Sequence, residues 1–239
     1  MVFYIQEGDI FKIPQLKNYA HGCNCAGAMG KGIALQFRNK FPKMYEHYKN
    51  ICKKDEFHVG EVFKYDYDDG VIFNLGTQRN WTERAHLEFI GESLHKMMVM
   101  ALDLGIKDIA MPAIGAGLGG CPWDEVKKLI SKLANEYPSV NLYVIEQYKD
   151  IEINIVYIKK RWEEDNITYY LHFIGEEAVR QIEVHPKKTL YLSIEKPISG
   201  NSLLYDQKLQ SLKESLEKKD YITGEEFEDI WSESYSSNK

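Results

Sequence analysis

The stretch HGCNCAGAMGKGIA at residues 21–34 decides the fold, together with a second stretch, PAIGAGLGGCPW, at residues 112–123. Each lies between a short apolar segment typical of a buried strand and a segment with helical periodicity. Glycines let the backbone turn tightly and direct several N–H groups at one anion, and the N-terminus of a following helix adds positive partial charge. Two such loops in one small domain predict a ligand with two phosphates, or a phosphate and a sugar, held between them.

The residues around the loops resemble the macrodomain family, which binds ADP-ribose. The resemblance is carried by Gly8-Asp9-Ile10 directly after the first strand, by Gly30-Lys31-Gly32-Ile33, and by the run at residues 114–119. It covers roughly the first 148 residues in the family's order. Within the family, HGCNCAGAMGKGIA is similar to two branches. One is the yeast-type ADP-ribose 1''-phosphate phosphatases, and the other is the DNA ADP-ribosyl glycohydrolases together with the terminal ADP-ribose protein glycohydrolases.

Strand-like and helical segments alternate over the first part of the chain. Strands are expected at residues 2–5, 19–23, 62–63, 71–75, 109–111 and 140–145, and helices from residue 31 with a break or bend at Pro42, at 87–104 and at 123–137. This alternation predicts a largely parallel sheet covered on both faces, with the ligand at the carboxyl ends of the strands. The fold class is therefore α/β. The resemblance implies a three-layer macrodomain over 1–149 with a mixed, largely parallel sheet.

The pattern changes after Tyr148. Short alternating segments at 153–158, 167–173, 178–184 and 189–194 indicate an antiparallel sheet, and the capping box TGEE at 223–226 predicts a final helix. We therefore expect a small α+β domain of unknown role over 150–233 and a disordered tail over 234–239.

Composition limits the class of protein. The apolar runs are far too short to span a bilayer, and the N-terminal MVFYIQEGD has none of the features of a secretory signal, so we expect a cytoplasmic protein with no membrane partner. Residues 1–149 carry 18 acidic and 18 basic side chains, so the whole net charge of −6 lies in the remainder. This balance argues against tight, non-specific binding of nucleic acid, although a single modified nucleotide remains a possible substrate.

Four cysteines, all in the first part, lack the spacing of a zinc site. Cys23 and Cys25 are separated by a single residue, which is tighter than the usual zinc knuckle. We expect no metal and no cofactor, and interpret the cysteines as small buried residues in reduced form.

The resemblance implies roles for individual residues. Asp9 would accept a hydrogen bond from the adenine amino group, or alternatively cap a turn. Asn24 would orient the distal ribose, or support its loop. Tyr148 would stack on adenine, or be a core residue at the domain boundary, and Lys31 is expected to point to solvent. The expected ligand-binding residues are Asp9, Ile10, Gly30, Gly32, Ile33, Gly115, Ala116, Gly117, Leu118, Gly119 and Tyr148.

Catalysis would fall to His21, with Asn24 positioning the ribose. A histidine suits acid–base work near neutral pH, and the resemblance to the yeast-type phosphatases implies a catalytic histidine there; the alternative is a hydrogen-bonded core residue. In the glycohydrolases the position of Gln78 is a lysine that acts on the ribose, and the protein glycohydrolases have an acidic residue where this chain has Gly119. Glutamine cannot perform the lysine chemistry, which favours the phosphatase-like branch or binding alone.

We therefore expect a protein that binds ADP-ribose or a close derivative, free or attached to a macromolecule, and hydrolyses at the distal ribose with water as the nucleophile. The alternative is a non-catalytic reader or sequestering protein. A third interpretation makes the macrodomain a targeting module for the C-terminal domain.

Overall fold

The computed structural model describes residues 1–236 and divides the chain into two compact units, Met1–Glu152 and a second unit that begins at Ile153. The two units are described separately. Within the described residues, no helix is long and apolar enough to cross a membrane.

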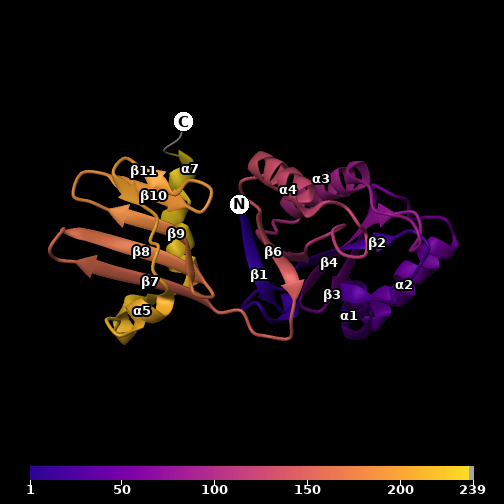
Figure 1. Cartoon of the computed structure of the whole chain (residues 1–239), viewed down its shortest axis with the longest axis horizontal. Helices are drawn as coiled ribbons and strands as arrows, with labels where there is room; N and C mark the ends of the chain where they lie inside the picture. The colour runs from indigo at the N-terminus through magenta and orange to yellow at the C-terminus, as the bar shows by residue number, and fades with distance from the viewer. Residues whose placement is uncertain (237–239) are drawn as a thin grey trace. The chain divides into compact units, whose positions relative to one another are not determined.

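The first unit is built on a six-stranded sheet (Figure 1). Its strands lie in the order β1-β6-β5-β2-β4-β3; β3 pairs antiparallel with β4 at one edge, and all the other pairs are parallel. The expected α/β class with a mixed, largely parallel sheet is therefore confirmed. The strands are β1 (Val2–Gly8), β2 (Tyr19–Asn24), β3 (Val62–Tyr67), β4 (Gly70–Gln78), β5 (Asp108–Pro112) and β6 (Asn141–Tyr148).

Helices cover both faces of this sheet. The helices α3 (Leu87–Asp103) and α4 (Trp123–Glu136) bury their apolar stripes against one face. On the opposite face, Phe37 of α1 (Gly32–Lys40) packs against β2. The run that begins at Lys31 divides at Pro42, which opens α2 (Pro42–Lys53), since proline is well suited to the first turn of a helix. Because both faces are covered, a polar side chain in the middle of β2 has no route to water.

The parallel arrangement brings the functional segments to one edge. The strands β1, β6, β5, β2 and β4 all end there, in that spatial order. The 3₁₀ helix η1 (Ile10–Lys12) follows β1, the second glycine loop follows β5 and the first follows β2. The carboxyl edge therefore runs from Asp9 and Tyr148 at one end to Gln78 at the other.

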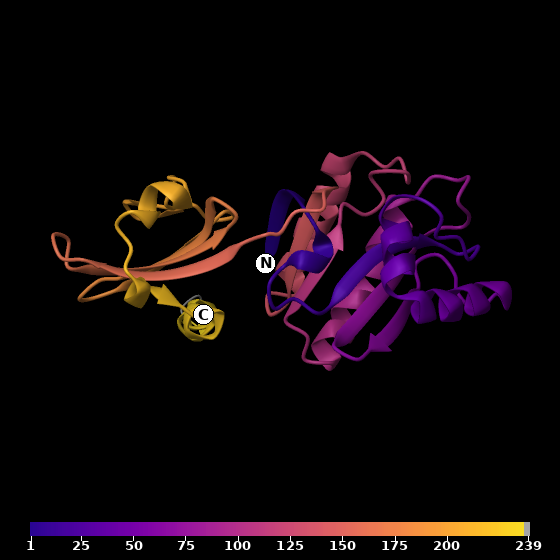
Figure 2. The same ribbon diagram turned by 90° about the horizontal axis from the view of Figure 1, so that it is seen from below.

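The second unit is an antiparallel sheet in the order β10-β9-β8-β7-β13, seen nearly edge-on in Figure 2. Leu209 and Leu212 of α5 pack with Phe173 on one face, and Phe227 of α6 packs with His172 on the other. Thr223 Oγ1 accepts from Glu226 N at 3.1 Å, which forms the capping half of the expected box. The elements are β7 (Ile155–Trp162), β8 (Ile167–Ile174), β9 (Glu177–Val184), β10 (Thr189–Ser193), β11 (Ile198–Ser199), β12 (Ser202–Leu203), α5 (Leu209–Lys213), η2 (Lys218–Asp220), β13 (Tyr221–Ile222), α6 (Gly224–Trp231) and α7 (Glu233–Ser236).

The helix α7 corrects the expected tail. Residues 234–236 are helical, and Ser234 is buried, so the second unit holds the chain in place beyond α6. Residues 237–239 of the expected tail lie outside the described residues.

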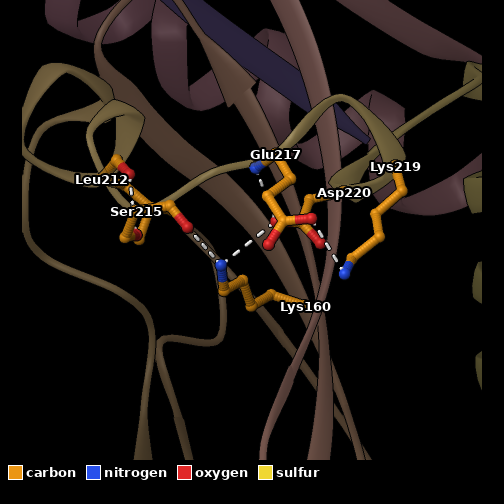
Figure 3. Close-up of polar contacts among 6 residues, drawn as sticks. All are labelled: Lys160, Leu212, Ser215, Glu217, Lys219 and Asp220. Carbon is orange, nitrogen blue, oxygen red and sulfur yellow. Dashed lines mark hydrogen bonds and ion pairs between the residues drawn. The ribbon is translucent and has the colours of Figure 1, made fainter.

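Polar contacts fasten η2 to β7 (Figure 3). Asp220 Oδ2 accepts from Glu217 N at 2.9 Å and from Lys160 Nζ at 3.1 Å, and Lys160 also donates to Ser215 O. These contacts hold the pKa of Asp220 below its usual value: the Glu217 N–H is the largest cause, burial opposes it and Lys160 adds to it.

We expect Asp220→Asn to lower the free energy of unfolding at pH 7 by about 1 kcal/mol, because a carboxylate that accepts two charge-favoured hydrogen bonds is replaced by a neutral amide. In the wild type the same contribution is complete above about pH 4 and is lost as the pH falls through the lowered pKa of Asp220. Urea titrations at pH 7 and pH 3 check this. The two proteins should differ most at pH 7 and less at pH 3, and an equal difference at both pH values would contradict the assignment.

Candidate functional site

One end of the carboxyl edge holds Asp9 and Tyr148. Asp9 is buried, and its Oδ1 caps η1 by accepting from Phe11 N at 2.9 Å. Tyr148 ends β6 opposite Gly8 and is 40% exposed. Burial raises the pKa of Tyr148, and the Asp9 carboxylate raises it further. The structure therefore brings a carboxylate and an exposed phenol ring together, with Ile10 buried beside them, and the cap uses only one carboxylate oxygen of Asp9.

The first glycine loop is shaped by the side chain of Asn24. Its Oδ1 accepts from Ala26 N at 3.0 Å, from Ala28 N at 3.2 Å and from Tyr48 Oη at 3.2 Å, and its Nδ2 donates to Ala28 O at 2.6 Å. Tyr48 Oη also donates to Asn24 O at 2.5 Å. Asn24 is thus the scaffold of the loop, as the alternative interpretation expected. Tyr48, which sequence reasoning did not single out, locks it from α2 and carries no motif that would have revealed it.

The outer half of this loop presents backbone donors. Gly32 begins α1 with φ +58°, a conformation that favours glycine, and Lys31 is exposed at the helix N-cap. Within residues 1–236, the N–H groups of Gly30, Gly32 and Ile33 have no hydrogen-bond acceptor. They lie at the positive end of α1, where an anion is favoured.

The second loop is fixed by its own backbone. Cys121 N donates to Gly115 O at 2.9 Å and Gly120 N to Gly117 O at 3.1 Å. A Cβ at position 119 would lie 2.6 Å from Gly115 O, so only glycine fits there. In the described part of the chain, the N–H groups of Gly117, Leu118 and Gly119 have no acceptor.

The two loops meet. A Cβ on Gly32 would lie 3.4 Å from Leu118 Cδ1, and Leu118 is itself 74% exposed. Ala116 lies in the tight turn of the second loop, where its N–H donates to Ala113 O at 3.4 Å. Residues of both loops therefore lie close together at the sheet edge. Backbone N–H groups brought together in this way suit two linked phosphate groups.

A segment at residues 79–86, here called the bridging segment, connects the two loops. Cys25 N donates to Gln78 O at 2.9 Å and to Arg79 O at 3.2 Å, and Ala85 N donates to Gly119 O at 2.9 Å. Gln78 pairs in register with Asn24, and its Nε2 donates to Glu83 O at 2.7 Å. Gln78 therefore lies at the first loop, with its amide engaged by the bridging segment.

His21 lies in the core and not among the loop donors. It is fully buried in β2, its ring stacks on Phe37 with centroids 3.9 Å apart, and its Nε2 donates to Asn74 Oδ1 at 2.9 Å. Burial lowers its pKa to about 4 against the opposing effect of Asn74, so the ring is neutral near pH 7. The structure thus supports the interpretation of His21 as a hydrogen-bonded core residue. His21 and Asn24 lie on the same strand, β2, but the His21 ring is not part of the loop that Asn24 shapes.

The cysteines show no activated thiolate. Burial raises the pKa of Cys25 to about 12 and also raises those of Cys23, Cys52 and Cys121. Among residues 1–236, no group of three or more histidine, cysteine, aspartate or glutamate side chains could hold a metal ion. The chemistry offered is therefore hydrogen bonding from backbone amides, with Asp9 at one end and neutral polar side chains at the other.

Known proteins are similar to this chain in sequence and fold. A model of the Macro domain matches residues 20–130. The ADP-ribose 1''-phosphate phosphatase of Candida albicans is 32% identical over 159 residues, which cover 61% of this chain and 100% of that protein. The chain belongs to the macrodomain family. The matched residues 20–130 lie within the first unit and include both glycine loops.

Two further matches extend this result. A DNA ADP-ribosyl glycohydrolase of Thermus aquaticus is 33% identical to the chain over 143 residues, which are 58% of this chain and 39% of that protein. The solved macrodomain of Mycobacterium tuberculosis DarG has a TM-score of 0.57 at 31% identity, over 61% of this chain and 97% of that chain. The chain thus spans about two fifths of the glycohydrolase it matches. Both branches suggested by the first loop are confirmed as relatives of this macrodomain.

Proposed function

We propose that the macrodomain binds ADP-ribose, or a derivative of it, along the carboxyl edge of its sheet. The observation that carries this proposal is the meeting of two glycine loops whose N–H groups have no acceptor within residues 1–236. The diphosphate would lie on these donors. Adenine would lie at Asp9 and Tyr148, and the distal ribose at Asn24 and Gln78.

The activity we propose is hydrolysis at the distal ribose. Relatives that match the chain are named as a phosphatase and as a glycohydrolase of ADP-ribose derivatives. The oxygen of water bonds to the atom that carries the departing group, which is the distal ribose carbon in a glycoside or the phosphorus in the phosphate ester. The bond from that atom to the departing oxygen or nitrogen breaks, and the proton lost by water is taken up by the departing group. The macrodomain contributes by holding the diphosphate and ribose in a fixed position, because positioning alone supplies a large part of many rate enhancements.

Binding without turnover is a second candidate, and particular residues favour it. His21 is buried and neutral, and the amide of Gln78 occupies the position of the glycohydrolase lysine. The site then lacks both acid–base groups that the family resemblance implies.

An assay of product release separates the two functions. The full chain is incubated with ADP-ribose 1''-phosphate, with ADP-ribosylated single-stranded DNA and with an ADP-ribosylated protein, and the products are separated by chromatography. Hydrolysis predicts release from the phosphate ester, with the DNA modification left essentially intact because no lysine is present. If all three substrates remain uncleaved at saturating protein, the result supports binding without turnover.

Gln78→Lys tests the missing chemistry. We expect this variant to gain weak release of ADP-ribose from modified DNA, because lysine restores the nitrogen that the glycohydrolases use. Gln78→Glu, which keeps the length of the side chain without a nucleophilic nitrogen, is the matched control and should gain nothing. Efficient release by the wild type would show that the chain removes the DNA modification without lysine.

A further inference from the structure

The chain that leaves the first unit is bonded to the residue at which we place adenine. Residues 149–154, here called the connector, lead from β6 to β7 (Figure 1). Lys149 N donates to Gly8 O at 3.0 Å, and Asp9 N donates to Ile151 O at 3.0 Å. The connector therefore holds the backbone of Asp9 in place.

The connector makes a tight turn where it contacts β1 and η1. Ile151 N donates to Lys149 O at 2.8 Å, which closes a three-residue turn centred on Asp150. Asp150 forms an ion pair with Lys12 of η1, and Lys149 forms one with Glu7 of β1. These contacts, together with the two backbone bonds above, are here called the latch. Exposed ion pairs contribute little to stability, so the latch opens at small cost.

The second unit holds the connector again a short distance further on. Asn154 O accepts from Gly175 N at 2.8 Å, in the turn between β8 and β9. Only two residues lie between Ile151 and Asn154. A closed latch therefore leaves few backbone dihedrals free between the two fixed points, whereas an open latch frees the chain from the end of β6 onward.

Binding at Asp9 distinguishes the two states of the latch. The N–H group of Asp9 belongs to the latch, and its Oδ1 accepts from Phe11 N at 2.9 Å. Adenine, as proposed above, donates to this carboxylate. Because the closed latch fixes the backbone that carries the carboxylate, the ligand binds the closed state more tightly than the open one. A ligand with such a preference shifts the equilibrium toward the state it prefers.

We propose that ADP-ribose bound at Asp9 closes the latch, so that occupancy of the site restrains the connector and, through it, the second unit. The inference rests on the proposed binding of ADP-ribose and makes no demand on turnover. Because coupling is reciprocal, opening the latch weakens the binding of ADP-ribose. The effect requires adenine, so ADP shares it and ribose 5-phosphate does not.

NMR on the full chain labelled with ¹⁵N tests the proposal. The amides of Lys149 and Ile151 report on the latch, because each donates a hydrogen bond within it. We expect their hydrogen exchange to slow about 5-fold with saturating ADP-ribose or ADP, and to stay unchanged with ribose 5-phosphate. Relaxation of the amides of the second unit should show slower tumbling when ADP-ribose is added. Calorimetry in the same buffer measures the affinity for ADP-ribose.

A charge swap tests the latch itself. Lys12→Glu places two acidic side chains together, so we expect faster exchange of the Ile151 amide and about 3-fold weaker binding of ADP-ribose. Lys12→Glu combined with Asp150→Lys restores the opposite charges and should recover both quantities. Lys17→Glu is the matched control, because it makes the same charge change at the exposed pair with Asp69, and it should alter neither quantity.

Four results would overturn the proposal. They are unchanged exchange of the latch amides with saturating ADP-ribose, equal protection by ribose 5-phosphate, unchanged tumbling of the second unit, and no recovery in the charge-swapped variant. A wild type that binds no ADP-ribose in the calorimeter contradicts the proposed function itself, which distinguishes that failure from the other four.

Discussion

His21→Ala is expected to lower the free energy of unfolding by about 3 kcal/mol, because it removes a fully buried ring from the contact with Phe37 and leaves Asn74 Oδ1 with only the weak Cys23 thiol as a donor. Folded protein should still bind ADP-ribose with an affinity within a few-fold of the wild type, because the ring does not reach the loops. Denaturant titration and calorimetry below the unfolding transition measure the two quantities. His86→Ala, at an exposed histidine, is the matched control and should cost little.

The same residue gives a pH dependence with a definite sign. The folded-state pKa of His21 is about 4, below the ordinary value near 6.5, so the unfolded chain binds the proton more readily between these values. The contribution of neutral His21 to the free energy of unfolding is complete above about pH 6.5. Up to roughly 3 kcal/mol of it is lost as the pH falls to 4. His172 is also buried with a lowered pKa, so the quantity to measure is the difference from His21→Asn, which cannot be protonated there. A difference that stays constant with pH would contradict the burial of a neutral His21.

Gly119→Ala should have the second largest effect, on ligand affinity. The new Cβ would lie 2.6 Å from Gly115 O and 3.0 Å from Ala85 Cβ, so the second loop must shift and lose its contact with the bridging segment. We expect the affinity for ADP-ribose to fall about 100-fold, or roughly 3 kcal/mol. Calorimetry on the folded variant measures this.

Gly91→Ala is the matched control for that substitution. Gly91 lies within α3, and its Cβ would meet only Leu129 methyl groups at 3.5 Å and 3.6 Å. The affinity should be unchanged. Wild-type affinity in Gly119→Ala would remove the second loop from the ligand site.

Much of the fold can be predicted from the sequence, since the regular elements of the first unit have clear periodicity and the glycine loops mark their ends. Pro42 ends one helix and opens the next, as its fixed φ requires. The elements that escaped prediction, such as η1, β11, β13 and α5, are two to five residues long. Segments of that length carry no period, and the rest of the unit decides their shape.

The candidate site is less accessible from sequence. In a strand with one solvent-exposed face, apolar and polar residues alternate, and the alternation would indicate whether His21 is exposed or buried. A sheet covered on both faces gives no such signal. The latch joins Asp9 and Lys12, near the start of the first unit, to residues at its end, and no local pattern indicates contacts between segments so far apart. The glycines, by contrast, indicate directly where the backbone turns tightly. The two loops that they predict lie close together in the structure, at Gly32 and Leu118.

Titration of the full chain with ADP-ribose tests whether the carboxyl edge of this macrodomain is an ADP-ribose site. We expect binding of one equivalent with a dissociation constant in the micromolar range, a binding free energy of roughly −8 kcal/mol. Asp9→Ala should weaken it by about 1–3 kcal/mol through the loss of the adenine contact. Absence of heat with ADP-ribose, together with binding of an unrelated nucleotide, would contradict the account.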